Sequence, residues 1–164
     1  MKITPTACAL LILVLCLGSV HGAEIGSFLD RDRVEITGAN SDGVVVRAVM
    51  VISRPPGFGG QGWRWGSEGS APAISMGQLD VYLGVNRVFV PISAYSDLGN
   101  PRSSTIETAD KGFQIVVRGG DAATSYKATL VFEGGLLRSR KVVNGEFPDE
   151  AWEETIYSFN VRRE

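Results

Sequence analysis

The stretch that decides the fold is Tyr126–Val143, YKATLVFEGGLLRSRKVV. In residues 126–132, apolar Tyr, Ala, Leu and Phe side chains occupy every second position, and Lys, Thr and Val lie between them. This period of two is typical of a half-buried β-strand. The Gly-Gly pair 134–135 then separates two β-rich runs, and adjacent glycines accept the positive φ angles of a tight hairpin turn. The stretch therefore predicts an antiparallel hairpin, with residues 136–143 as its second strand.

Similar short β-rich runs, bounded by Gly, Pro, Asn and Asp, occur along most of the chain. The run 44–52 is apolar on both faces, which predicts a central strand that is covered on both sides. Together with the hairpin, these runs bring the expected total to about nine strands, with the spacing of a sandwich or barrel. The other runs are 34–36, 74–83, 88–92, 106–108, 113–117 and 155–161.

Helical signals are almost missing from the sequence. Residues 148–154 alone look helical, because Pro148 suits a first helical position and the acids that follow it suit the positive end of a helix dipole. Parallel sheets need crossover helices that this sequence does not offer. We therefore expect an all-β fold, a single antiparallel β-sandwich of immunoglobulin-like or jelly-roll-like kind, with at most one short helix near 148–154.

The first 22 residues have the layout of a secretory signal. Lys2 precedes an unbroken apolar run of 11 residues, 7–17, and small residues follow it up to Gly22. A membrane span needs about 20 apolar residues, so the run is too short for a stable anchor. We expect residues 1–22 to be a cleavable signal peptide and residues 23–164 to be one domain with no transmembrane segment. A cut after Ala23, or a buried N-terminal element, are the alternatives.

Composition excludes several chemistries after cleavage. The single His and both Cys lie within residues 1–22, so the remaining chain has no imidazole and no thiol. Disulfides, Cys nucleophiles, Ser-His-Asp triads and zinc sites of nitrogen and sulfur ligands are therefore ruled out. We expect no catalytic residue, no metal and no cofactor, and this composition favours a protein that is not an enzyme.

Net charge and composition also indicate which partners and which location to expect. The whole chain has a net charge of −2, and removal of Lys2 leaves 15 basic and 18 acidic residues, a net charge of −3. The positive excess expected of a nucleic-acid-binding protein is missing, so we expect no nucleic-acid partner. The lack of disulfides and of Asn-x-Ser/Thr acceptors fits a bacterial protein, exported to the periplasm or secreted.

The loop 54–73 carries the most informative side chains. It is rich in glycine but holds Phe58, Trp63, Arg64 and Trp65, and long loops in compact domains are usually functional or disordered. In extended backbone, the two Trp rings would project to one side and form a stacking platform for a sugar ring or another flat apolar ligand. The alternative is that one or both rings fold back as a hydrophobic lid on the end of the sandwich.

The acidic side chains suggest two other kinds of site, which the sequence supports less well than a site in the loop 54–73. A calcium site or a glycosidase-like carboxylate pair needs a spacing that this sequence lacks, and turn chemistry explains the loop oxygens of residues 97–100 and Asp121 equally well. A solvated short helix is the favoured interpretation of the acidic cluster. The cluster consists of Glu146, Asp149, Glu150, Glu153 and Glu154.

Two functional hypotheses from different classes remain. The first is an exported, non-catalytic β-sandwich module with a binding or structural role in the cell envelope or outside the cell, whose partner is an unknown protein or glycan. The alternative is a carbohydrate-binding or carboxylate-dependent carbohydrate-active module that uses the Trp63/Trp65 loop.

Overall fold

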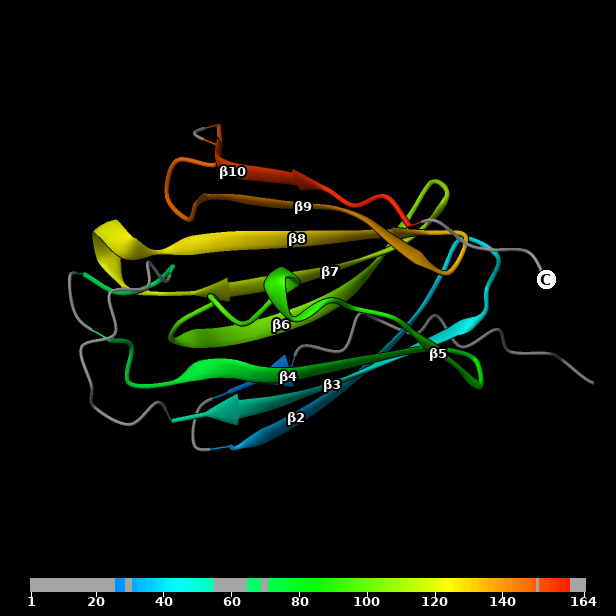
Figure 1. Cartoon of the computed structure of the whole chain (residues 1–164), viewed down its shortest axis with the longest axis horizontal. Helices are drawn as coiled ribbons and strands as arrows, with labels where there is room; N and C mark the ends of the chain where they lie inside the picture. Colours follow the sequence, from blue (N-terminus) through cyan, green and yellow to red (C-terminus); the bar gives the residue numbers. More distant parts are fainter. Residues whose placement is uncertain (1–25, 29–30, 55–64, 69–70, 150, 160–164) are drawn as a thin grey trace, which may run out of the picture.

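The computed structural model describes residues 26–28, 31–54, 65–68, 71–149 and 151–159. In these residues the chain forms ten strands in two antiparallel sheets that face each other (Figure 1). The expectation of an all-β sandwich is therefore confirmed. The six-stranded sheet has the order β1 (Gly26–Ser27), β6 (Pro101–Ala109), β7 (Gly112–Gly119), β8 (Tyr126–Glu133), β9 (Leu136–Asn144) and β10 (Ala151–Ile156). The four-stranded sheet has the order β2 (Arg33–Ala39), β3 (Val45–Ser53), β4 (Ser75–Leu83) and β5 (Asn86–Val88).

The predicted hairpin is β8 and β9. Gly134 and Gly135 have φ angles of 58° and 73°, which is the conformation that a tight turn between twisted strands requires. Along β8, buried and half-buried residues alternate without exception, and the buried set begins at Tyr126 and ends at Phe132. The register predicted from the period of two is therefore confirmed.

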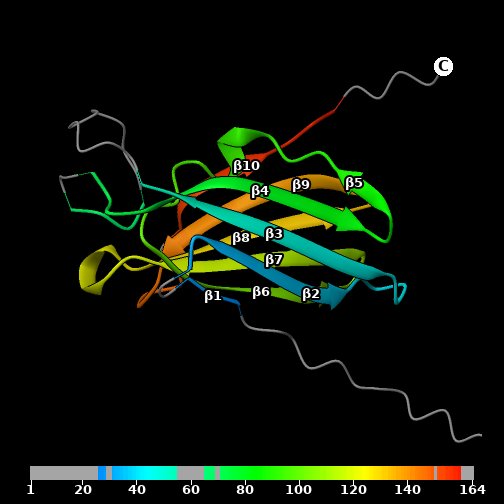
Figure 2. The ribbon, with the colours of Figure 1, turned by 90° about the horizontal axis from the view of Figure 1, so that it is seen from below.

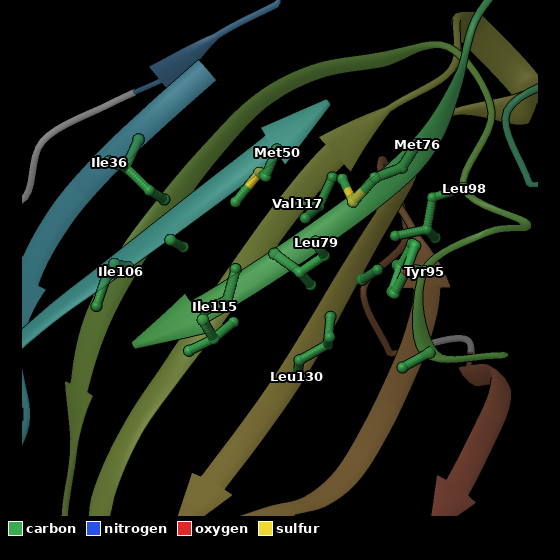
Figure 3. Close-up of a cluster of buried hydrophobic side chains, with 14 of the residues drawn as sticks. Ile36, Met50, Met76, Leu79, Tyr95, Leu98, Ile106, Ile115, Val117 and Leu130 are labelled. Atoms are coloured by element: carbon green, nitrogen blue, oxygen red, sulfur yellow. The ribbon is translucent and has the colours of Figure 1, made fainter. Parts of the chain in front are cut away.

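The core lies between the two sheets (Figure 3). Ile36 and Met50 enter it from the four-stranded sheet, and Ile115 and Leu130 enter it from the six-stranded sheet, all four with no exposed surface. Leu98, on the connection between β5 and β6, points into the same cluster. Burial of this apolar surface is the main force that holds the sheets together.

The expected helix at 148–154 is wrong. Residues Ala151–Ile156 form β10, which pairs antiparallel with β9. The backbone groups along the edge of β9 offer β10 a ladder of hydrogen bonds, with one irregularity between Ala151 and Glu153. A favourable charge at a helix terminus contributes only about 0.3–1 kcal/mol. The described residues form two short 3₁₀ helices elsewhere, η1 (Ile92–Ala94) and η2 (Ala122–Thr124). Neither has the length or the apolar character that crossing a membrane requires.

Several connections gather at one end of the sandwich, on the left of Figure 1, and Figure 2 shows the same end from below. We call it the loop end, and it is formed by residues 65–68, 71–75, 97–100, 119–125 and 145–149. Backbone hydrogen bonds join its segments: Trp65 N donates to Asp97 O, Gly120 N to Asn100 O, and Gly145 N to Ser125 O. The hairpin turn at 134–135 lies at the opposite end.

Candidate functional site

Two tryptophans stack at the loop end. The ring centroids of Trp65 and Trp152 lie 5.3 Å apart, and the ring planes differ by 10°. Trp65 is buried, with 7% of its surface exposed, whereas Trp152 at the start of β10 is half-buried. The accessible surface of this tryptophan pair therefore belongs mainly to Trp152.

The pair differs from the platform that the sequence suggested. Of the four candidate side chains in the loop 54–73, Phe58, Trp63 and Arg64 lie outside the described residues, so the platform of Trp63 and Trp65 stays a prediction. Trp65 is placed as the lid alternative requires, packed onto the core. Its aromatic neighbour Trp152 was missed, because the sequence assigned that residue to a helix far along the chain.

Trp65 is held by backbone contacts on both sides. Its N–H donates to the carbonyl of Asp97, and its carbonyl accepts from the N–H of Gly99, which forms a short parallel bridge with the connection between β5 and β6. Gly66, the next residue, has a φ of 81°, and a Cβ atom there would collide with the carbonyl oxygen of Gly99. The turn after Trp65 therefore requires glycine.

A hollow of about 230 Å³ adjoins the tryptophan pair and is lined by both rings together with Gly66, Ala123 and Thr124. The two last residues lie in η2, which Asp121 caps: its side chain accepts from Ala122 N at 3.0 Å. The hollow is smaller than the range of about 300–1,000 Å³ that encloses drug-sized ligands. It therefore suits one ring of a larger ligand.

A second hollow, of about 580 Å³, is lined by part of the 119–125 loop. We call it the basic pocket, because Arg102, Arg118 and Lys127 line it, together with the acids Asp121 and Glu146. A third hollow of about 530 Å³ shares Asp121 and Ala122 with the basic pocket and shares Gly66 and Thr124 with the tryptophan hollow. The three hollows therefore adjoin one another around η2.

A buried charged cluster lies beneath the loop end. Arg140 on β9 is 2% exposed, and its Nη2 donates to Asp97 Oδ2 at 2.7 Å and lies 3.5 Å from Glu153 Oε2. Its Nη1 donates to the carbonyl of Ser93 at 2.8 Å. The sequence alone does not reveal this cluster, because nothing in the alternation of β9 distinguishes Arg140 from the exposed basic residues beside it.

Tyr126 lies close to this cluster and is almost completely buried. Burial raises the pKa of the Tyr126 hydroxyl strongly, the nearby Asp97 carboxylate raises it further, and Arg140 lowers it. The Tyr126 hydroxyl, Asp97 Oδ1 and Arg140 Nε are buried and form no hydrogen bond within the described part of the protein. The burial of these three polar atoms is therefore not offset by hydrogen bonds to described residues.

The acidic residues do not form a metal site among the described residues, where no group of three or more His, Cys, Asp or Glu is close enough to hold an ion. Glu153 faces Arg140, and Glu150 lies outside the described residues. Asn100 is occupied as well: its Oδ1 accepts from Ile74 N at 3.3 Å, and its Nδ2 donates to Gly66 O at 2.8 Å. These contacts agree with turn chemistry in the 97–100 loop.

No protein-family model matches the chain, and no curated protein and no solved structure matches it either.

Proposed function

We propose that the protein is an exported, non-catalytic binding module that holds a glycan at its loop end. The observation that carries the proposal is the tryptophan pair, Trp65 and Trp152, stacked beside an adjoining series of hollows. An aromatic face offers a large, rigid apolar surface to the C–H face of a sugar ring. Glu68, which lines the neighbouring hollow, adds a carboxylate that would accept hydrogen bonds from sugar hydroxyl groups.

Partial exposure of Trp152 favours binding over a purely structural role. A hydrophobic lid gains most when both of its rings are removed from water, yet Trp152 stays half-buried while its partner is covered. Ligand sites typically combine an apolar surface of this kind with a few polar groups. The half-exposed ring is therefore the place where a ligand gains contact area.

The absence of His and Cys from residues 23–164 supports a non-catalytic role. Export is supported by the apolar run 7–17 and the small residues after it. Intact mass of the protein recovered outside the cytoplasm tests export directly, and a mature N-terminus at Ala23 or Glu24 is the expected result. A mass that retains Met1 would contradict it.

Affinity electrophoresis in gels that contain soluble polysaccharides tests glycan binding. For a polysaccharide that retards the wild type, we expect Trp152→Ala to bind at least tenfold more weakly. Trp152→Phe should keep part of the wild-type affinity, because an aromatic face remains. Phe89→Ala is the matched control. Phe89 is an aromatic residue with 65% exposure in the connection between β5 and η1, away from the loop end. Equal retardation of the wild type and Trp152→Ala would show that the pair does not bind glycan.

A further inference from the structure

Two positive charges lie directly opposite each other on neighbouring strands. Arg118 on β7 is the register partner of Lys127 on β8, and both lie on the outer face of the six-stranded sheet beside the basic pocket. Like charges that face each other across two strands destabilise a sheet, whereas opposite charges in the same positions stabilise it. A sequence that keeps such a pair accepts a cost in folding stability.

The fold does not neutralise this pair. No residue in the described ranges forms an ion pair or a hydrogen bond with the side chain of Arg118 or Lys127. The third cation, Arg102, is paired with Asp121 at 3.1 Å, so this acid is already engaged. Glu146 then remains as the one other acid that lines the basic pocket, which leaves two free cations against one acid.

A second, independent feature of the same pocket is Ser125. Its hydroxyl oxygen is buried and forms no hydrogen bond with any described residue, although Ser125 lines the pocket. A rotation about χ1 toward the pocket therefore breaks no existing hydrogen bond, and a bound acceptor would satisfy the group. The pocket thus offers two charged donors and one neutral donor to the same ligand.

We infer that the basic pocket binds the carboxylate or sulfate group of an acidic polysaccharide. Arginine presents a planar fork of donors that matches a carboxylate or sulfate, and lysine adds a compact charge. The third hollow connects the basic pocket to the tryptophan hollow around η2, because it shares lining residues with each of them. One chain of sugars therefore contacts both, so this inference rests on the proposed glycan binding and specifies its substrate class.

Two forms of one polymer distinguish recognition of the negative charge from recognition of the sugar backbone. Polygalacturonate carries a carboxylate on each ring, and its methyl ester has the same backbone without the charge. We expect the wild type to bind polygalacturonate at least tenfold more tightly than the ester in low salt, and dextran sulfate more tightly than dextran. Arg118→Gln/Lys127→Gln should abolish this preference and keep the affinity for the neutral polymers within about twofold.

A matched control removes the same charge elsewhere. Lys111→Gln/Arg138→Gln changes two exposed cations toward the opposite end of the same sheet, and it should leave the preference intact. Equal losses in both double variants would show a non-specific effect of net charge and overturn the inference. Equal wild-type affinity for polygalacturonate and its ester would overturn it as well.

Monomeric sugars distinguish failure of this inference from failure of the proposed function. Galacturonate should shift the backbone amide signals of Ser125 and Lys127 in ¹H–¹⁵N spectra, and galactose should not. If these shifts occur while Trp152→Ala leaves polymer binding unchanged, the anion site stands and the tryptophan pair is not a glycan site. If Trp152→Ala abolishes binding but acid and ester bind equally, glycan binding stands and the anion site is wrong.

Discussion

Arg140 Nη2 and Asp97 Oδ2 form a hydrogen-bonded ion pair of 2.7 Å inside the protein. The residue after Asp97 is the bridge partner of Trp65, and Glu153, which also faces Arg140, follows Trp152 in the chain. A single buried guanidinium therefore ties together the two segments that carry the tryptophan pair. We conclude that Arg140 is a positioning residue for the loop end.

The two halves of this ion pair should not be equally costly to remove. Asp97→Ala leaves the guanidinium of Arg140, which is 2% exposed, with Glu153 at 3.5 Å as its remaining carboxylate, so the loss should approach about 3–5 kcal/mol, the cost of breaking a buried pair. Arg140→Met should cost less, because the side chains of Asp97 and Glu153 are 30% and 31% exposed and stay hydrated. Urea unfolding of both variants provides the comparison.

The double variant Asp97→Ala/Arg140→Met is the control for this asymmetry. It removes the buried positive charge that Asp97→Ala leaves without its hydrogen-bonded partner, so the double variant should be more stable than Asp97→Ala alone. Additive losses in the two single variants would mean that the pair is not coupled.

Tyr126 should make the protein sensitive to alkaline pH. Burial, and then the charge of Asp97, hold the pKa of the Tyr126 hydroxyl above its usual value of about 10. The contribution of Tyr126 to stability is therefore complete below pH 10 and is lost as the pH rises above that value, because only the unfolded chain ionises there. Each pH unit above 10 should cost up to about 1.4 kcal/mol.

Tyr126→Phe isolates this effect from the other groups that titrate at high pH. At pH 7 the variant should be as stable as the wild type, or more stable by about 1 kcal/mol, since no described residue forms a hydrogen bond with the buried hydroxyl. Its stability relative to the wild type should then increase between pH 10 and pH 11.5 in urea unfolding. Parallel pH profiles for the two proteins would refute the assignment.

The parts of the fold that could be predicted from the sequence are those set by local pattern. The alternation in 126–132 and the glycines 134–135 specify a strand register and a turn with no help from distant residues. Residues 148–154 failed because a helical signal of a few residues is weaker than the edge of β9, which no local pattern reveals. The same dependence on distant partners explains the candidate site. Trp65 could be selected from its loop, whereas its stacking on Trp152 arises only when β10 joins the sheet.

Phe132 and Lys127 test the register of β8 directly. Phe132 has no exposed surface and stacks on Phe113 with ring centroids 4.6 Å apart, so Phe132→Ala should cost about 3–5 kcal/mol through lost burial and a cavity. Lys127→Ala, on the outer face opposite Arg118, should cost little or increase stability slightly. Similar shifts of the urea midpoint in both variants would contradict this register, because a slip of one residue exchanges the two faces.

The two members of the tryptophan pair should separate stability from binding. Trp65→Ala should destabilise the fold by about 3–5 kcal/mol, because a buried ring is removed from the core. Trp152→Ala should cost about 1–3 kcal/mol, since this ring is half-exposed and its loss leaves the backbone bridge of Trp65 to Leu98 in place. Acrylamide quenching of tryptophan emission, measured on a Trp63→Phe background, tests the same difference. Trp65→Phe then keeps only Trp152, and Trp152→Phe keeps only Trp65. The emission of Trp65→Phe should be quenched more strongly. Equal quenching, together with equal losses of stability, would mean that both rings serve the core, and the exposed aromatic surface on which glycan binding depends would not exist.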